Sequence, residues 1–488
     1  MRKFMDPFPS LFESAETPPL TEEQSAIVHS NAQPLVVKAF AGSGKTWTLD
    51  KYARARPGKR ILYVAFNKSV QQEAEKRFPR NVVSKTSHSL TFGKTYRAGR
   101  FGNKRLGNLR PMDVRKLYSL TPSQSKVVLD TLNGFMASAD REFGTQHIPL
   151  VFSSRMEAAS KARVVDYARD LWSKILDPSA DIVVPHDAYL KLFQIENMSF
   201  GHYDIILFDE AQDANPVTTA IVMAQPGAKV FVGDSHQGIY QFRGAQDMLD
   251  KIAADKTLYL TQSFRFGRGI AHVATQLLSR LKNEQRKVIG LGKHETRFEV
   301  DFNKGYAFLA RTNAALFDEA VGVMQQNKPF HFIGGVEGYR FDMILDAWAL
   351  SVNRKDLIRD PYILSFESFS EMKEFGQEAD DKEIKMLCRV VENYGDYIPV
   401  LVEQIKKKAE RTPSEHSVRF GTAHKSKGLE FDQVVLADDF MDFFDEENQP
   451  VDAASAKVED ANIIYVAATR AMQAIQLPYD MKLWLGMD

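Results

Sequence analysis

A glycine-rich segment at the end of an apolar strand carries the strongest chemical signal in the chain. Residues 39–46, AFAGSGKT, end the apolar run PLVVKAF and precede a predicted helix. Small side chains there let backbone N–H groups close around phosphate oxygens, while a lysine adds a point charge and a threonine hydroxyl can reach Mg²⁺. The strict pattern has glycine where Ala39 stands, and the alternative is a glycine-rich turn without a ligand. The predicted nucleotide-binding residues are Ala41, Gly42, Ser43, Gly44, Lys45 and Thr46.

A pair of carboxylates ends a second apolar strand. Asp209 and Glu210 follow the run DIILF and begin the segment DEAQD. A carboxylate at the end of a strand can hold Mg²⁺ while its neighbour orients an attacking water molecule. Such a pair also commonly caps a helix, but the phosphate loop upstream favours hydrolysis. Together the two motifs predict a nucleotide hydrolase that uses Mg²⁺.

Short apolar runs without polar alternation recur along the chain and must position these motifs. Strands of this kind are buried on both faces, which predicts parallel sheets covered by helices. Ligands bind at the carboxyl ends of such strands, where the polar motifs of this sequence lie. The runs cover residues 34–40, 60–66, 203–210, 228–234, 305–313 and 431–439.

Two mainly helical stretches interrupt this rhythm, and the second is also rich in charge. Both are flanked by strand-rich segments, so the fold class predicted is α/β with two cores, each carrying one helical insertion. The predicted division is a first core at residues 1–94 and 182–258 with a basic insertion at 95–181, then a second core at 259–338 and 413–488 with a reduced insertion at 339–412.

Length and composition limit the classes of protein that fit. The chain has 488 residues, 44% of them hydrophobic, and its 63 Lys+Arg balance 63 Asp+Glu. A zero net charge argues against a histone-like protein that holds polyanions by bulk charge. The single cysteine, Cys388, excludes internal disulfides and cysteine-rich metal modules. No run approaches the length of a membrane span, so we expect a cytoplasmic protein without a membrane partner, associated with the nucleoid if the source is bacterial.

Three further segments extend the pattern beyond a general nucleotide hydrolase. They are VGDSHQGIYQFRGA at residues 232–245, TAHKSKGLEFDQVVLADD at 422–439 and IIYVAATRA at 463–471. With these motifs the chain resembles superfamily 1A DNA helicases of the UvrD, PcrA and Rep type. The segments VKAFAGSGKTWTL and ILYVAFNKSVQQEAEKRFP are most similar to the F-box DNA helicase branch, although no F-box-like segment is recognisable before Thr21. The resemblance covers residues 20–471 and implies two RecA-like P-loop cores.

The resemblance implies that ATP binds between the two cores. Gln24 of LTEEQ would read the adenine edge, Phe264 would stack on the base and Glu430 would contact the sugar. Gln237 would sense the γ-phosphate, and two arginines of the second core would reach the same phosphate when the cleft closes. The implied catalytic residues are Lys45, Asp209, Glu210, Gln237, Arg265 and Arg470, and the implied Mg²⁺ ligands are Thr46 and Asp209.

The resemblance also implies a groove for single-stranded DNA. Aromatic side chains suit such a groove because every base has a π-face on which they can stack. The alternative for two of them, Phe66 and Phe242, is an ordinary place in the core. The implied DNA-binding residues are Phe66, Asn67, His88, Tyr240, Phe242, Arg243, Thr422 and His424.

The segment from residue 80 to 126 is strongly basic. It holds eleven Lys and Arg residues and one acid, Asp113, which gives a net charge of 11 − 1 = +10. A charged run is usually a solvated face, but a stretch so poor in acids is also suited to follow the phosphates of DNA. This segment predicts DNA binding that weakens steeply with salt.

The family resemblance implies an ATP-dependent 3′→5′ DNA helicase or single-strand translocase in repair, recombination control or defence. Its partners would be single-stranded DNA and junctions of single and double strands, with a nuclease or recombinase as a further protein partner. The second insertion is short, about 80 residues between the flanking motifs, which puts duplex engagement of the UvrD kind in doubt. The alternatives are an ATPase that strips proteins from DNA and a sensor of DNA ends that signals to a nuclease.

Overall fold

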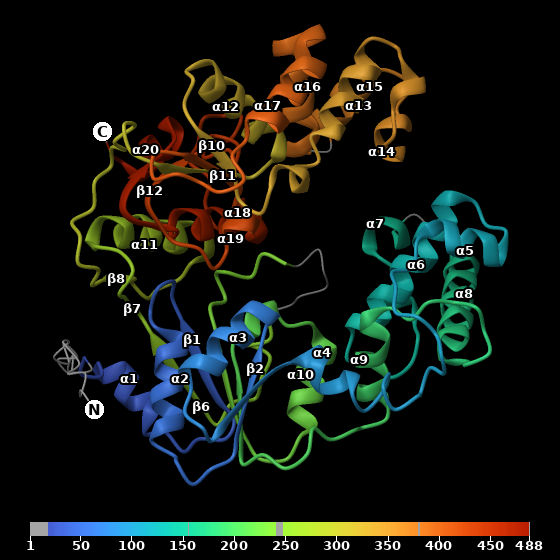
Figure 1. Ribbon diagram of the computed structural model, residues 1–488, viewed down its shortest axis with the longest axis vertical. Helices are drawn as coiled ribbons and strands as arrows, with labels where there is room; N and C mark the ends of the chain where they lie inside the picture. The colour runs from blue at the N-terminus through green and yellow to red at the C-terminus, as the bar shows by residue number, and fades with distance from the viewer. Residues whose placement is uncertain (1–17, 155, 241–246, 379–380, 488) are drawn as a thin grey trace, which may run out of the picture.

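The computed structural model describes residues 18–154, 156–240, 247–378 and 381–487, and these form an α/β molecule built on two parallel sheets. Figure 1 shows the sheets one above the other, the first in blue to green segments and the second in yellow to red ones. The predicted fold class is confirmed, and the strand-rich runs of the sequence all form strands.

The first sheet has six strands in the order β3-β2-β4-β5-β1-β6, and all neighbouring strands are parallel. Parallel strands need crossover connections, which here include helices on both faces. The carboxyl ends of these strands lie at one edge, where the phosphate loop and the segment DEAQD follow. The elements are α1 (Glu22–Val28), β1 (Leu35–Ala39), α2 (Lys45–Arg54), β2 (Ile61–Ala65), α3 (Lys68–Arg77), β3 (Val82–Thr86), β4 (Ile205–Phe208), α10 (Pro216–Ala224), β5 (Ala228–Gly233) and β6 (Lys256–Leu260).

The second sheet has five parallel strands in the order β10-β11-β9-β12-β13. Between the two sheets, β7 (Gln262–Ser263) pairs with β8 (Ile289–Gly290) in the segment that links the cores. The other elements of the second core are α11 (Arg268–Lys282), β9 (Tyr306–Ala310), α12 (Asn313–Gln325), β10 (Phe330–Phe332), β11 (Val418–Thr422), α18 (Ala423–Ser426), β12 (Phe431–Leu436), α19 (Val458–Ala468), β13 (Ala471–Gln476) and α20 (Tyr479–Leu485).

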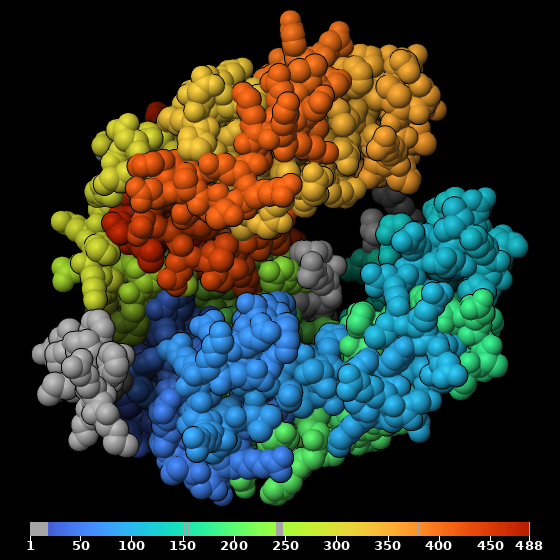
Figure 2. Space-filling model, in the orientation of Figure 1, coloured from blue at the N-terminus to red at the C-terminus, as the bar shows by residue number. Residues whose placement is uncertain are grey.

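Two groups of helices stand on the same side of the molecule. In Figure 2 the outer ends of the two groups, cyan and orange-yellow, are separated by a hollow. The first group contains α4 (Ser87–Phe92), α5 (Pro111–Tyr118), α6 (Pro122–Ala137), α7 (Leu150–Ser153), α8 (Ala158–Leu176) and α9 (His186–Ile195). The second contains α13 (Asp342–Ser351), α14 (Pro361–Leu364), α15 (Phe369–Glu378), α16 (Lys382–Tyr394) and α17 (Ile398–Lys408).

The structure differs from two details of the predicted division. The expected boundary between residues 258 and 259 falls inside β6, which belongs entirely to the first sheet. The predicted insertion, a mainly helical stretch at residues 95–181, has its first helix only from Pro111 onward. Residues 93–103 form turns, with Gly99 and Gly102 at positive φ angles of 78° and 64° that favour glycine, and residues 104–110 contain no helix. The other boundaries remain predictions.

The apolar cores join the sheets to the inserted helices. One cluster packs a face of the first sheet against the first group of helices, and a second cluster fills the opposite face. The cluster of the second core also takes in Phe40, Ala41 and Ile239 from the first core. The start of the phosphate loop is therefore packed against both halves. No helix in the described part of the chain is long and apolar enough to cross a bilayer.

Candidate nucleotide and nucleic-acid sites

The loop between β1 and α2 has the backbone form that a phosphate cradle requires. Gly42 and Gly44 have φ angles of 71° and 77°, in the left-handed region that favours glycine. Helix α2 begins at Lys45, and its N-cap residue is Gly44. Because glycine has no side chain to cap the helix, the first N–H groups of α2 remain for an anion.

Three oxygen-bearing side chains meet behind this loop. The hydroxyl of Thr46 donates to Asp209 Oδ2 at 3.1 Å, and the buried hydroxyl of Tyr63 donates to the same oxygen at 2.7 Å. Tyr63 lies on β2, beside β4, so the parallel pairing of these strands places it next to the carboxylate. Hydroxyl and carboxylate oxygens are the ligands that Mg²⁺ takes. Thr46 and Asp209 therefore fit the predicted metal site.

Glu210 is held between the phosphate loop and its own segment. Its Oε1 lies 3.3 Å from Lys45 Nζ, and its Oε2 accepts from Gln212 Nε2 at 2.6 Å. The backbone of Glu210 is left-handed, with φ of 52°, a conformation that is strained for a residue with a side chain. The same Gln212 accepts from the backbone N–H of Asp234 at 3.0 Å, which ties DEAQD to GDSHQ.

The charged side chains of this cluster shift one another's pKa values. Burial by itself would lower the pKa of Lys45, but the carboxylates of Glu210, Asp234 and Asp209 raise it above the ordinary value. Burial opposes ionisation of Glu210, yet Lys45 and Lys427 lower its pKa to about 2. Burial and the charge of Glu210 raise the pKa of Asp209. The cluster therefore keeps Lys45 and Glu210 charged at neutral pH.

The second core closes the cleft with residues of α19, of the segment that follows it and of the turn after α18. Arg470 Nη2 donates to Gln237 Oε1 at 3.4 Å, and the hydroxyl of Tyr465 accepts from the backbone N–H of Ala41 at 3.1 Å. Lys427 Nζ donates to the backbone oxygen of Gln237 at 2.5 Å and pairs with Asp213. These contacts join sequence motifs that lie about 190 to 420 residues apart.

Arg470 is the largest of the fully buried side chains, with 1% of its surface exposed. Its guanidinium also donates to the backbone oxygens of Val466 and Leu429. Burial and the neighbouring Arg265 lower the pKa of Arg470 to about 9, so the side chain stays protonated at neutral pH. A buried cation held mainly by carbonyl oxygens is ready to pair with an anion that enters the cleft.

The residues predicted to read base and sugar also meet at the phosphate loop. A side chain at Gly44 would lie 3.6 Å from Gln24 Nε2 and 3.8 Å from the ring of Phe264. Glu430 Oε1 accepts from Arg265 Nε at 2.7 Å instead of lying free for a sugar. The hydroxyls of Ser43 and Ser263 are buried and lack a hydrogen-bond partner among the described residues. Unpartnered polar atoms beside the loop fit a polar ligand such as a nucleotide.

Two aromatic residues predicted to bind DNA lie together: Phe66, which follows β2, and Tyr240, which follows the segment GDSHQ. The rings of Phe66 and Tyr240 stack with centroids 5.7 Å apart. They line a cavity of about 300 Å³ together with His88, Glu210 and Asp213. Because Glu210 also contacts Lys45, the cavity connects the aromatic pair to the nucleotide site through one carboxylate.

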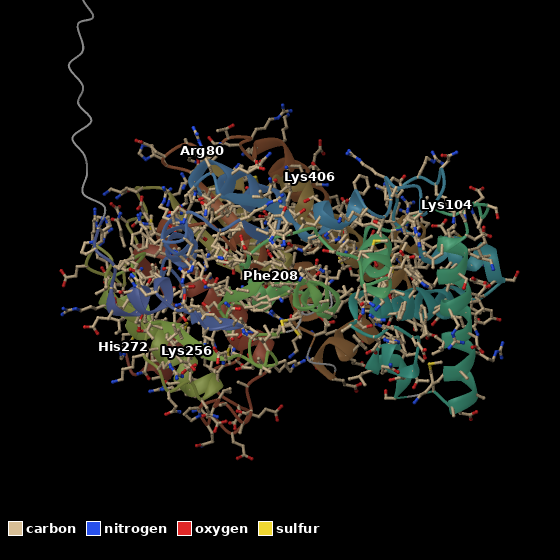
Figure 3. All side chains as sticks on the ribbon, turned by 90° about the horizontal axis from the view of Figure 1, so that it is seen from below. Arg80, Lys104, Phe208, Lys256, His272 and Lys406 are labelled. Carbon is tan, nitrogen blue, oxygen red and sulfur yellow. The ribbon has the colours of Figure 1, made fainter. Side chains whose placement is uncertain are left out.

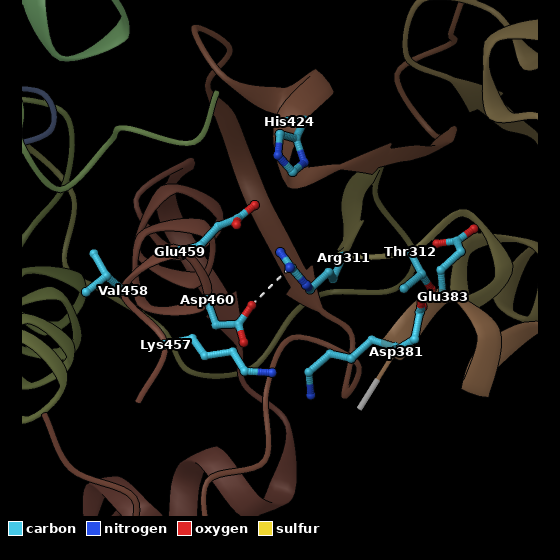
Figure 4. A pocket seen from close by; sticks show the side chains of 10 residues that line it. Arg311, Thr312, Asp381, Glu383, His424, Lys457, Val458, Glu459 and Asp460 are labelled. Atoms are coloured by element: carbon cyan, nitrogen blue, oxygen red, sulfur yellow. Dashed lines mark ion pairs between the residues drawn. The ribbon is translucent and has the colours of Figure 1, made fainter. Parts of the chain in front are cut away.

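His424 lies on the second core above a polar cavity of about 730 Å³ (Figure 4). Its Nε2 lies 3.1 Å from the backbone oxygen of Ile239. Arg311 in the same cavity pairs with Asp460 of α19 at 3.0 Å. The DNA-binding role predicted for His424 stays a prediction.

Two of the four other residues predicted to bind DNA have a local role at the start of a helix. Asn67 and Thr422 cap helices, since their side-chain oxygens accept from Val70 N at 2.9 Å and Lys425 N at 3.4 Å. A capping role is local and does not bring either residue to a ligand by itself. The remaining two, Phe242 and Arg243, lie outside the described residues.

Some cations of the basic segment bind other parts of the protein, which the sequence did not indicate. Lys104 Nζ donates to the carbonyl oxygens of Lys174 and Ile175 at the end of α8, and burial lowers its pKa. Arg100 pairs with Glu196. Figure 3 shows Lys104 beside the inserted helices and Arg80 in the first core, between α3 and β3. Within the described residues, no ion pair involves the exposed cations Arg105, Arg110, Arg115 and Lys116.

Several residues of the site were missed by sequence reasoning. Tyr63 gave no signal, because a tyrosine in an apolar strand looks like an ordinary core residue. Lys427 and Tyr465 stand inside quoted motifs, and only the three-dimensional fold reveals that they cross from the second core to Asp213 and Ala41.

Comparison with known proteins agrees with this geometry. Residues 23–243 match a family model described as AAA domain, and residues 362–481 match the UvrD-like helicase C-terminal domain. The chain belongs to the UvrD-like superfamily 1 helicases. It is 33% identical to F-box DNA helicase 1 of Gallus gallus and 31% identical to F-box DNA helicase protein 1 of Schizosaccharomyces pombe, in each case over 96% of this chain.

The chain spans 50% of the Gallus gallus relative and 58% of the Schizosaccharomyces pombe one. DNA helicase II of Escherichia coli is 25% identical over 42% of this chain and 32% of its own length. Membership of the UvrD-like family rests on the matched models and on the alignments that run through both cores. This membership is consistent with the two parallel sheets and with the phosphate loop at the edge of the first sheet.

Gly42→Ala tests whether the phosphate loop needs to touch the linker between the cores. An added Cβ would lie 2.5 Å from Ser263 Oγ and 2.6 Å from Arg265 Cβ, at a φ of 71°. Left-handed strain of about 1–2 kcal/mol plus the clash would displace the linker. We expect ATPase activity, measured by phosphate release, to fall at least about tenfold. Gly58→Ala is the control, because no atom lies within 4 Å of its added Cβ; equal activity of the two variants would contradict the assignment.

Replacing Arg105, Arg110, Arg115 and Lys116 with Gln tests the basic segment. If these exposed cations contact phosphates, the slope of log affinity against log salt should fall by about 3, at roughly 0.7–0.9 for each contact. Fluorescence anisotropy with a labelled oligonucleotide at several salt concentrations measures the slope. The control changes Lys126 and Arg169, which pair with Asp130 and Asp166 on their own helices. An unchanged slope in the fourfold variant would exclude phosphate tracking by this segment.

Proposed function

We propose that this chain is an ATP-dependent DNA helicase that translocates 3′→5′ along single-stranded DNA. The observation that carries the proposal is the contact of Arg470 with Gln237 across the cleft, 3.4 Å long, beside the pair of Lys45 and Glu210. An arginine that reaches the nucleotide site from the opposite core can link hydrolysis to movement of that core. The polarity is taken from the family.

Hydrolysis would begin when the phosphates of ATP take Lys45 away from Glu210. The carboxylate of Glu210, held by Gln212 and ionised at neutral pH, would then accept a hydrogen bond from the attacking water. The water oxygen would bond to the γ-phosphorus as the bond to the bridging oxygen breaks, ADP would leave, and Glu210 would take the proton of the water. Thr46 and Asp209 would hold Mg²⁺, which when bound would neutralise phosphate charge.

Arg265 and Arg470 would act on the same phosphoryl group from the second core. Arg265 is oriented by the backbone oxygen of Thr469 at 2.9 Å, so the two arginines move with one segment. Guanidinium groups stabilise the charge that spreads over the transferred phosphoryl group. Loss of the γ-phosphate removes this attraction and would let the cores separate.

Movement along DNA would follow from the placement of the aromatic pair. Phe66 belongs to the first core, and Tyr240 lies where the ring of His424, from the second core, is 6.2 Å away. A change in the angle between the cores would therefore move the rings on which bases stack at this point. Stacking of about 1–3 kcal/mol for each base is strong enough to hold a strand and weak enough to release it.

A second candidate is a translocase that displaces proteins from single strands, or senses DNA ends for a nuclease, without processive unwinding. The compact second insertion favours it, since α13–α17 occupy only residues 342–408. The relatives in Gallus gallus and Schizosaccharomyces pombe are DNA helicases by name, which favours unwinding. We therefore propose unwinding as the main activity, with a recombinase or nuclease as a candidate partner.

Lys45→Ala is expected to abolish ATPase activity stimulated by single-stranded DNA. Loss of the charge at the β- and γ-phosphates should lower turnover at least about 100-fold. DNA affinity without nucleotide should stay within about twofold of the unmodified protein, because Lys45 lies outside the aromatic cavity. Normal turnover in this variant would refute the site assignment.

Strand displacement on duplexes with a 3′ or a 5′ tail tests unwinding and polarity. We expect displacement only with the 3′ tail, and only with ATP and Mg²⁺. ATPase activity without displacement on either substrate would favour the second candidate. Equal stimulation of the ATPase by RNA and DNA would contradict the assignment of DNA as the substrate.

A further inference from the structure

Glu23 joins the first helix of the chain to the linker between the two cores. Its Oε2 accepts from the backbone N–H of Thr261 at 2.8 Å, and its Oε1 accepts from the hydroxyl of Thr261 at 2.6 Å. The two residues are 238 positions apart in the sequence. Both oxygens of this partly buried carboxylate therefore accept hydrogen bonds from Thr261, at the point where β6 ends and the linker begins.

The residues on each side of this contact are the ones predicted to read the base. Gln24 follows Glu23 in α1, and Phe264 follows Thr261 by three positions in the linker. A Cβ at Gly44 would lie 3.6 Å from Gln24 Nε2 and 3.8 Å from the Phe264 ring, so the two side chains converge on the phosphate loop from different segments.

The rest of the linker has fixed partners in both cores. The backbone N–H of Phe264 donates to Gly42 O at 2.9 Å, which anchors it to the phosphate loop. On the other side, Ile289 N donates to Thr261 O and Leu291 N donates to Ser263 O. Glu23 therefore supplies the connection between the linker and α1.

We propose that Glu23 is a positioning residue that sets the preference of this site for adenine. The proposal rests on the proposed function, in which ATP binds between the cores. Glu23 holds Gln24 and Phe264 as one unit, so that the amide meets the edge of the base while the ring covers its face. Two reading groups from separate segments discriminate between bases only when their spacing is fixed to a fraction of an ångström.

The physical basis is that a charged acceptor holds two donors of Thr261 at once. Charge-assisted hydrogen bonds are roughly twice as strong as neutral ones. Without the carboxylate, α1 would still pack against α2 and β6, so the fold remains. The position of the linker relative to Gln24 would no longer be fixed. Contacts to the exocyclic group of the base would therefore weaken more than contacts to the phosphates.

The test compares ATP with ITP, which carries an oxygen in place of the exocyclic amine of adenine. We would measure kcat and KM for both nucleotides, with saturating single-stranded DNA, in the full chain and its variants. Glu23→Ala should lower the ratio of kcat/KM for ATP to that for ITP about tenfold, through a higher KM for ATP with kcat changed less than about threefold. Glu23→Gln, which retains one acceptor, should lie between.

The matched control is Glu22→Ala, because Glu22 is the exposed neighbour in the same turn of α1. It should leave the ratio unchanged. Thr261→Val removes only the hydroxyl, provides a second variant if Glu23→Ala fails to fold, and should lower the ratio about threefold.

An unchanged ratio in folded Glu23→Ala, with KM raised equally for ATP and ITP, would overturn the proposal, because a merely structural role would affect both nucleotides alike. A wild-type protein that does not discriminate between ATP and ITP would overturn it as well. Absence of ATP hydrolysis in the wild type would instead refute the proposed function, so the two failures are distinguishable.

Discussion

The grouping of partly buried Lys45 and Glu210 with buried Asp209, in a cleft between two sheets, is the constraint on which the rest of the structure depends. Isolated charges cannot be buried without a large desolvation cost, so each must be paired or hydrogen-bonded. Here the first core pairs Lys45 with Glu210, and Tyr63 supports Asp209 from the neighbouring strand. The second core completes the cluster by placing Lys427 beside Asp213. The two cores are thus tied together by the chemistry of the cleft and by apolar contact.

The same constraint explains why the nucleotide and DNA regions lie so close together. Glu210 contacts Lys45 on one side and lines the cavity of Phe66 and Tyr240 on the other. Glu210 is therefore a direct physical connection between the two regions, without a long chain of intermediate residues. Under the proposed function, coupling between the two sites would act over a short range, through this carboxylate and its neighbours.

The sequence predicted much of this arrangement because its signals were local. The runs before Gly42 and Asp209 are short and rich in Val, Ile and Leu, which favours buried strands, and parallel pairing brings their carboxyl ends to one edge. The partners across the cleft could not be predicted from physical patterns, since Tyr465 and Lys427 look like ordinary members of a helix and a turn. The contact of Glu23 with the linker was hidden for the same reason: no periodicity connects residues 238 positions apart.

The basic segment shows the limit of counting charges. Of its eleven cations, Lys104 closes the end of a helix and Arg100 pairs with an acid, so a net charge of +10 overstates the surface available to DNA. The zero net charge of the whole chain is likewise a sum over regions with different tasks. Exposed cations such as Arg105 and Lys116 are the part of that charge that can face phosphate.

The most direct test of the account is an experimental structure of the protein with a non-hydrolysable ATP analogue, Mg²⁺ and single-stranded DNA. The account predicts that Lys45 leaves Glu210 for the β- and γ-phosphates, and that the guanidinium groups of Arg265 and Arg470 turn to the γ-phosphate. It also predicts bases stacked between Phe66 and Tyr240. A bound analogue with Arg470 still on the carbonyl oxygens of the second core, and Lys45 still paired with Glu210, would contradict the claim that the two cores form one catalytic site.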